Sequence, residues 1–158
     1  KKNDIVITLD SDNTHPVNLI PQMNSLLTLE NFDIVIASRF QIGGKVKGLS
    51  LFRTSLSIVA KIVFKLIINI KSVNDYTCNY RAYNFSILRK SKLINKKFFL
   101  DKDFSIASAL LIGINKNIDN LNICEIPLIL RYDKKIGASK MKIGTNILKT
   151  LNLILRNF

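Results

Sequence analysis

A short apolar run that ends in acids and turn formers is the feature that most constrains the fold of this chain. Residues 5–9 are β-forming, and Asp10 and Asp12 follow within a cluster of turn-forming residues. Apolar residues then recur at helical spacing over residues 19–27, and a second β-type run covers residues 33–37. Strand, helix and strand within about 35 residues predict an α/β fold with a mainly parallel, largely buried sheet flanked by helices.

The rest of the chain continues this pattern. With 158 residues it is expected to form one domain, which excludes a multidomain enzyme. No apolar run approaches the roughly 18 residues that cross a bilayer, because Lys61 and Lys65 interrupt the richest stretch. Residues 74–83 are polar and aromatic without clear periodicity. The further predicted elements are a flexible loop at 43–48, helices over 51–70, 85–93, 104–112 and 142–158, a β-run over 123–132, and a basic loop at 133–140.

The charge balance suggests an anionic partner. Lys and Arg number 24 against 11 Asp and Glu, a net charge of +13. Nucleic acid, an anionic membrane surface and a phosphorylated substrate all fit such a charge, but a solvated lysine-rich surface explains much of it equally well. Basic residues interleaved with aromatic ones, as in RNA-binding sheets, are absent, so no nucleic acid is expected.

Cysteine and histidine are scarce. Cys78 and Cys124 lie far apart without metal-ligand spacing, which predicts buried, reduced thiols in a cytosolic compartment. The single His15 leaves little room for a Ser-His-Asp triad or a His-rich metal site.

The acids and arginines suggest a site for phosphates. Asp10 and Asp12, one residue apart on a tight loop, can share Mg²⁺ or Mn²⁺ and the diphosphate that this ion neutralises, although a solvated Asp-rich turn is the alternative. Arg39 ends the next strand and is therefore expected at the same carboxyl edge of the sheet. Arg53 and Ser57, one helical turn apart, offer an anion a guanidinium and a hydroxyl.

The basic loop at 133–140 is a second candidate phosphate site. Gly137 permits close approach of the backbone, and cationic and hydroxyl side chains surround it. It lacks Walker spacing, so a P-loop is not predicted. The side chains expected to contact phosphate here are Lys134, Ser139 and Lys140.

Five ordered motifs resemble a known family over almost the whole chain. They are LDSDNTHP at 9–16, ASRF at 37–40, DYTCNYRAY at 75–83, EIP at 125–127 and GASKM at 137–141. Together they resemble family 2 glycosyltransferases of the dolichol-phosphate mannose synthase type. The resemblance implies a Rossmann-like GT-A fold in which residues 1–158 form a single partial domain, N-terminally truncated and without the strand and loop that bind the nucleotide base in relatives. Such a chain is expected to bind nucleotides weakly and to have little activity by itself.

The resemblance also implies a reaction. Inverting transfer would move a sugar, mannose or glucose, from a donor of the GDP-mannose or UDP-glucose type to a polyprenyl or dolichyl phosphate. The enzyme would lie peripherally at the cytoplasmic face of the membrane. An acceptor phosphate is already anionic, so the enzyme needs no strong base and chiefly aligns two anions and stabilises the leaving diphosphate.

Roles follow by position in the matched motifs. The metal ligands would be Asp10 and Asp12, and the donor would be bound by Asp10, Asp12, Thr14, Lys134, Ser139 and Lys140. The acceptor phosphate would be bound by Arg39, Arg53 and Ser57, and the site would be lined by Asp75, Thr77 and Arg81. The residues expected to be catalytic are Asp12, Arg39 and Asp103. Relatives often carry Arg in place of Lys134 and usually Glu in place of Asp103.

Two alternatives remain at this point. A transferase acting on a saccharide hydroxyl would need a base, for which Asp103 or Asp75 is the available candidate. A non-catalytic module that binds anionic lipid or nucleic acid would show steep salt dependence and no response to Mn²⁺.

Overall fold

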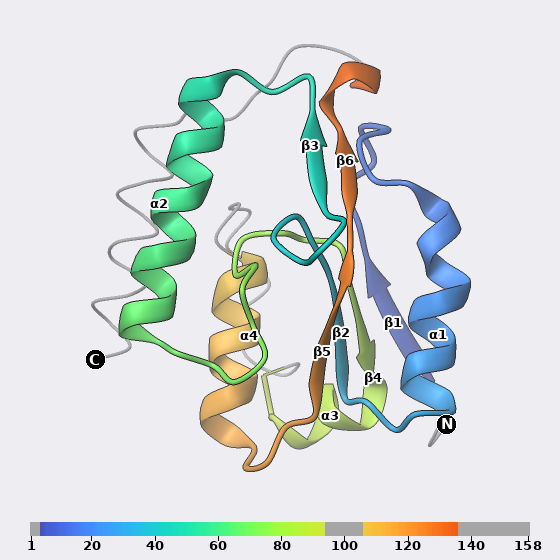
Figure 1. Ribbon diagram of the computed structural model, residues 1–158. Helices are drawn as coiled ribbons and strands as arrows, with labels where there is room; N and C mark the ends of the chain where they lie inside the picture. Colours follow the sequence, from blue (N-terminus) through green and yellow to red (C-terminus); the bar gives the residue numbers. More distant parts are fainter. Residues whose placement is uncertain (1–3, 94–105, 136–158) are drawn as a thin grey trace.

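The computed structural model describes residues 4–93 and 106–135, in which helices cover both faces of a four-stranded sheet (Figure 1). The predicted helix at 142–158, the last part of the basic loop and Asp103 lie outside the described residues.

The main sheet has the strand order β1-β4-β2-β5. It contains β1 (Ile5–Thr8), β4 (Arg81–Asn84), β2 (Ile34–Ser38) and β5 (Ile123–Pro127). β4 pairs antiparallel with both β1 and β2, whereas β2 and β5 are parallel. Three of the four strands therefore run in one direction, and the predicted α/β class is confirmed.

β4 is the element that the sequence pattern missed. It separates β1 from β2, which the strand–helix–strand pattern had placed as neighbours. Residues 74–83 show no clear periodicity in the sequence, and the last three of them belong to β4. Tyr83 and Ala82 pair with β1 and β2 on either side, and both are buried.

The side chains of β2 alternate between the two faces of the sheet, which explains why helices pack on both faces. Ile34 and Ile36 face a cluster with residues of α2 (Leu51–Ile67), α3 (Phe85–Lys90) and α4 (Ile106–Asn117). Val35 and Ala37 face the opposite cluster with α1 (Ile20–Thr28). A strand buried on both faces reads as a continuous apolar run, as this one does.

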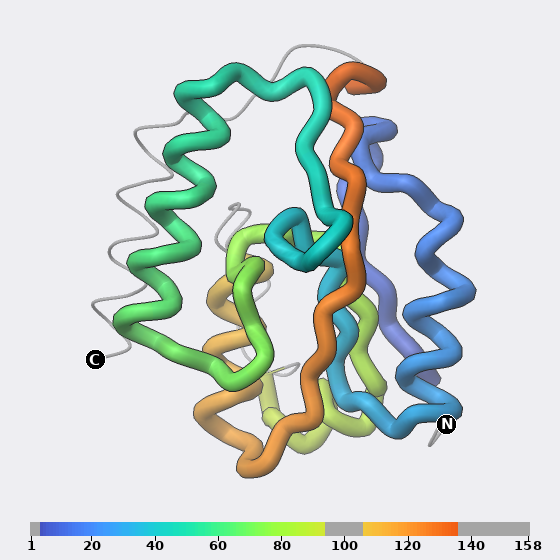
Figure 2. Tube along the Cα trace, viewed as in Figure 1, coloured from blue at the N-terminus to red at the C-terminus, as the bar shows by residue number. Residues whose placement is uncertain are grey.

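A second, parallel two-stranded sheet joins β3 (Lys45–Lys47) to β6 (Ile129–Arg131). The predicted β-run at 123–132 is therefore split at Leu128, whose N–H donates to the Ser38 carbonyl (2.9 Å) and whose carbonyl accepts from the Lys45 N–H (2.9 Å). The predicted loop at 43–48 is wrong at β3. Figure 2 shows the two segments side by side, with the 3₁₀ helix Tyr132–Lys134 directly after β6.

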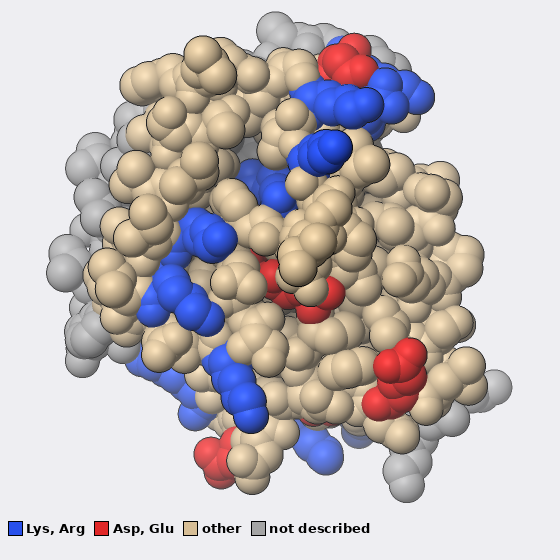
Figure 3. Space-filling view, viewed as in Figure 1, with Lys and Arg blue, Asp and Glu red and all other residues tan. Residues whose placement is uncertain are grey.

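α2 matches the predicted long helix and leaves an apolar face exposed. It begins after Ser50, whose hydroxyl accepts from the Arg53 N–H (3.4 Å) as an N-cap. Within the described part of the chain, no helix is long and apolar enough to span a membrane. In Figure 3, basic side chains lie over the lower part of this helix, whereas its upper part is tan. Its exposed apolar residues are Leu51, Phe52, Ile58, Val59, Ile62, Leu66 and Ile67.

Candidate functional site

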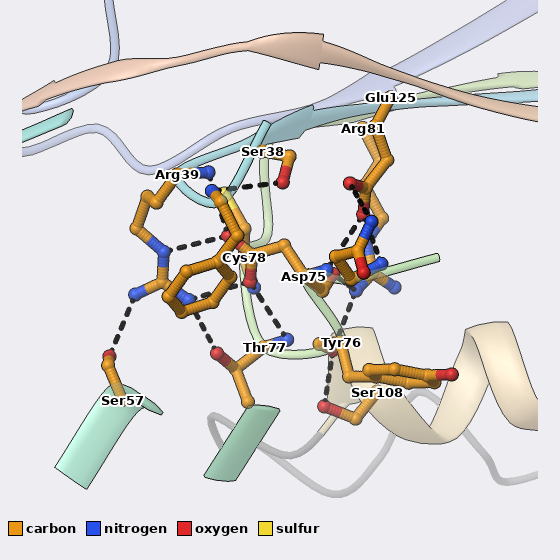
Figure 4. Close-up of polar contacts among 12 residues, drawn as sticks. Ser38, Arg39, Ser57, Asp75, Tyr76, Thr77, Cys78, Arg81, Ser108 and Glu125 are labelled. Carbon is orange, nitrogen blue, oxygen red and sulfur yellow. Dashed lines mark hydrogen bonds and ion pairs between the residues drawn. The ribbon is translucent and has the colours of Figure 1, made fainter. Parts of the chain in front are cut away.

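Arg39, directly after β2, is held by a buried carboxylate (Figure 4). Its Nε donates to Asp75 Oδ2 (2.8 Å), its Nη2 to Asp75 Oδ1 (2.6 Å), and its backbone N–H also to Oδ2 (3.1 Å). The Asp75 side chain is 0% exposed. The turn at the end of β2 and the loop before β4 are thereby fixed to one another.

Two hydroxyls complete the surroundings of Arg39. Nη1 donates to Ser57 Oγ on α2 (3.2 Å), and Nη2 donates to Thr77 Oγ1 (2.6 Å). The structure thus brings together four predicted site residues from three segments. Of the five N–H groups of Arg39, a single Nη1–H is left for a substrate anion within the described structure. Most of the donors of Arg39 are therefore used within the protein, and Asp75 is their main acceptor.

The ion pair sets the protonation states of both groups. Burial alone would raise the pKa of Asp75, but the charge and hydrogen bonds of Arg39 outweigh it and hold the pKa below its ordinary value. Burial alone would lower the pKa of Arg39, but Asp75 raises it further above its ordinary value. Both groups are charged at neutral pH.

Glu125 on β5 holds the start of the loop that contains Asp75. No role is expected for this acid from the sequence. Its Oε1 accepts from the backbone N–H groups of Asn74 and Asp75 (2.7 Å each), and its Oε2 accepts from Asn74 Nδ2 (3.3 Å). The acid belongs to a matched motif, EIP. That motif was the one signal available in the sequence.

Arg81, expected to line the site, supports the loop from within the protein. It is 0% exposed, and its Nη2 donates to the carbonyls of Tyr76 (2.7 Å) and Asp75 (3.3 Å). Its Nη1 donates to the Ala107 carbonyl on α4. Ser108 adds a hydrogen bond to the Tyr76 carbonyl (2.7 Å). Arg81 therefore joins the loop to α4.

The two acids of the D-x-D motif lie in the loop that follows β1. Asp10 Oδ1 accepts from Asn79 Nδ2 (3.1 Å), which links this loop to the one that contains Asp75. Asp12 Oδ1 accepts from the N–H (3.2 Å) and the hydroxyl (2.6 Å) of Thr14. Asp12 Oδ2 forms an ion pair with the Lys135 ammonium.

The lysine beside Asp12 is Lys135, whereas Lys134 is the lysine expected to contact the donor phosphates. Lys134 is exposed at the end of the 3₁₀ helix, whereas Lys135 is partly buried. Burial would raise the pKa of Asp12, but the hydrogen bonds from Lys135 and Thr14 lower it below the ordinary value. Of the other predicted members of this loop, Ser139 and Lys140 lie outside the described residues.

His15, set aside at the sequence level, is part of this loop. Its Nδ1 accepts from the Asp10 N–H (2.9 Å), so in the neutral ring Nε2 bears the proton, 3.9 Å from Asp10 Oδ2. The ring stacks on Tyr80 with 5.2 Å between centroids. Burial lowers the pKa of His15 below its ordinary value, against the opposing charge of Asp10.

Asp10 and Asp12 are the described carboxylates that could hold Mg²⁺ or Mn²⁺. No group of three or more His, Cys, Asp or Glu is placed for a metal among the described residues. Two carboxylates completed by phosphate and water oxygens are nevertheless the usual donor set for such ions. The donor set fits once Asp12 Oδ2 is released from Lys135.

Arg53 stands apart from these contacts. It lies one turn before Ser57 on α2, and its guanidinium has no hydrogen bond or ion pair among the described residues. Ser57 already accepts from Arg39. Of the expected acceptor-phosphate residues, Arg53 is therefore the one with its side-chain donors unused in the described structure.

Comparison with known proteins identifies the fold. No family model matches the chain. A solved structure of glucosyl-3-phosphoglycerate synthase from Mycobacterium tuberculosis with Mn²⁺ and UDP-Glc matches with a TM-score of 0.63 and 18% identity, over 99% of this chain and 50% of that one. The same enzyme with Mn²⁺, UDP and phosphoglyceric acid gives 0.62 and 17%, over 99% and 49%.

The chain thus spans about half the length of the solved structures that it matches. Identity this low establishes the fold and not the substrates. The GT-A glycosyltransferase fold that the motifs imply is the fold of this chain.

Proposed function

We propose that this chain belongs to a metal-dependent, inverting glycosyltransferase that moves mannose or glucose from a nucleotide diphosphate sugar to a polyprenyl phosphate. The observation that carries the proposal is the D-x-D carboxylate pair at the carboxyl end of β1, faced by Lys135, in a GT-A fold. Ligands are bound at this end of the strands in open α/β sheets.

Asp10 and Asp12 would hold the divalent ion, and that ion supplies charge to stabilise the leaving diphosphate. Lys135 adds a positive charge at the same place. Arg53, with the remaining Nη1–H of Arg39, offers donors to the acceptor phosphate, while Asp75 and Thr77 hold Arg39 in position. Because the acceptor is already an anion, alignment and charge stabilisation suffice, and no general base is required.

The exposed apolar face of α2 favours a lipid acceptor over a soluble one. Solved structures with this fold contain phosphoglyceric acid or glycerol 3-phosphate, which share a phosphate with polyprenyl phosphate but have no apolar chain. A helix that exposes Leu51, Phe52 and Leu66 and also carries Lys61 and Lys65 has the composition of an interfacial helix. Peripheral contact with the cytoplasmic face of the membrane is accordingly part of the proposal.

Thermal-shift titration tests donor binding. The full-length protein is titrated with GDP-mannose and UDP-glucose, with and without Mn²⁺, beside an Asp12→Ala variant. We expect Mn²⁺-dependent stabilisation by one donor, which the variant loses, because a ligand that binds only the folded state stabilises it. No stabilisation by any donor, with the variant behaving as wild type, would contradict the proposal and favour a non-catalytic module.

Transfer of labelled sugar tests the acceptor. Polyprenyl phosphate in detergent is compared with 3-phosphoglycerate and with a free oligosaccharide. Labelled lipid product is expected. If phosphoglycerate or the oligosaccharide is labelled and the lipid is not, the protein is a glycosyltransferase but the proposed lipid acceptor is wrong.

A further inference from the structure

We infer that Lys135 is an exchangeable counter-cation: it neutralises Asp12 in the ligand-free protein, is displaced by a divalent cation, and then binds the donor diphosphate. The inference rests on the proposed function for its second half only. The competition between Lys135 and the cation stands on the geometry of the Asp12 loop.

The first step is that Asp12 has a single oxygen available. Oδ1 is taken by the N–H and hydroxyl of Thr14, so Oδ2 is the oxygen open to an external cation. Lys135 Nζ is bound to that oxygen. The Asp12 side chain is 27% exposed and the Lys135 side chain is 20% exposed. The ammonium therefore occupies a partly enclosed position, at the oxygen that an external cation would bind.

The second step is that the backbone on each side of this contact is fixed, and that Lys135 Nζ contacts Asp12 Oδ2 and lies over the Tyr132 ring, 5.5 Å from the ring centroid. The Arg131 N–H donates to the Thr14 carbonyl (3.0 Å), which joins β6 to the D-x-D loop. Gly48, beside β3, packs against the backbone of Asp133. Lys135 can therefore change partner by side-chain rotation alone, keeping its charge within reach of the site.

The third step is electrostatic. An ammonium and a divalent cation at one carboxylate oxygen repel each other strongly at contact distance, so they bind in competition. A displaced ammonium is free to bind another anion, and lysine commonly binds phosphate as a point charge. The arriving donor diphosphate is that anion.

Mn²⁺ binding to the 158-residue chain tests the competition. Free Mn²⁺ is followed by electron paramagnetic resonance in wild type, Lys135→Gln, Lys135→Arg and the matched control Lys134→Gln. Removing the competing charge is expected to tighten Mn²⁺ binding about tenfold in Lys135→Gln. Lys135→Arg keeps the charge and should bind as wild type, and the exposed Lys134 should change the affinity less than about twofold. Unchanged affinity in Lys135→Gln, or no Mn²⁺ binding by any variant, overturns the inference.

Inorganic pyrophosphate, titrated at saturating Mn²⁺, tests the exchange. Lys135→Gln should bind pyrophosphate several-fold more weakly than wild type, although it binds Mn²⁺ more tightly. A gain in both affinities overturns the transfer of Lys135 to phosphate. Tighter Mn²⁺ binding with no pyrophosphate binding by any variant supports the counter-cation role and contradicts the proposed function, so the two failures are distinguishable.

Discussion

Arg39 and Asp75 form a two-point ion pair inside the protein, with Nε 2.8 Å from Oδ2 and Nη2 2.6 Å from Oδ1. The pair joins the end of β2 to the loop before β4, and through Ser57 it reaches α2. Water hydrates this pair poorly, because the Arg39 side chain is only 10% exposed and the Asp75 side chain is 0% exposed. The arrangement of the site consequently depends on both charges being present.

Removing one partner of this pair should destabilise the protein severely. Arg39→Met leaves the Asp75 carboxylate buried without its counter-ion, which costs about 3–5 kcal/mol of unfolding free energy. Asp75→Leu should cost a similar amount, whereas the double variant should cost less than either single one. Urea unfolding of the four proteins measures the coupling. Additive losses would show that the pair does not act as a unit.

Acid should weaken the fold through the same carboxylate. The pKa of Asp75 is depressed in the folded state from an ordinary value of 3.8, so its contribution is complete above that pH and is lost as pH falls below it towards the folded-state pKa. The slope from this group alone reaches about 1.4 kcal/mol per pH unit. Unfolding free energies at pH 5, 4 and 3 should fall less steeply in the Arg39→Met/Asp75→Leu variant. Parallel curves would assign acid sensitivity to other groups.

The predicted elements that the structure confirms are those whose apolar spacing reports burial. β1, α1, β2 and α2 begin and end within a few residues of their predicted positions because one or both faces are packed. The sequence does not reveal β4, because Arg81 places a charge at a buried strand position. Its Nη1 and Nη2 donate to backbone carbonyls, while its buried Nε has no hydrogen-bond partner among the described residues, and no sequence pattern predicts this. The antiparallel position of β4 between β1 and β2 depends on pairing with strands that are distant in the sequence.

The sequence predicts which residues form the site better than it predicts which of them contact one another. Arg39, Ser57, Asp75 and Thr77 were all singled out, and the structure places them in contact. The sequence cannot distinguish Lys134 from Lys135, because the turn of the 3₁₀ helix decides which side chain faces Asp12.

Glu125 is expected to act as a positioning residue for the Asp75 loop. Glu125→Ala leaves the N–H groups of Asn74 and Asp75 without their acceptor, which should cost about 2–3 kcal/mol of unfolding free energy. Glu125→Gln keeps one carbonyl oxygen and should cost less. Thermal and urea unfolding provide the measurement. Equal losses in the two variants would indicate that the carboxylate charge, and not the hydrogen bonds, holds the loop.

Arg53 should affect the acceptor and not the donor. Arg53→Ala is expected to raise the KM for polyprenyl phosphate about tenfold while donor binding by thermal shift stays nearly unchanged, because the guanidinium has no structural partner among the described residues. Lys90→Ala is the control, since Lys90 is an exposed cation on α3 with no role in the proposed site. Equal losses of donor and acceptor binding would remove Arg53 from the acceptor site.

Gly48 should be essential for keeping β3 against the segment that carries Lys135. Its φ of +78° is a left-handed conformation, and a Cβ there would lie 2.5 Å from the Asp133 backbone nitrogen. Gly43 has a φ of +88° but a Cβ there would meet only Pro127 Cβ, at 3.6 Å, and Pro127 Cγ, at 4.0 Å. Gly43→Ala therefore carries the backbone strain alone, about 1 kcal/mol, whereas Gly48→Ala adds a clash with backbone that cannot rotate away. We expect Gly48→Ala to lower the unfolding free energy by at least about 2 kcal/mol more than Gly43→Ala. Urea unfolding measures the difference, and equal losses would mean that β3 and the Asp133 turn separate without cost.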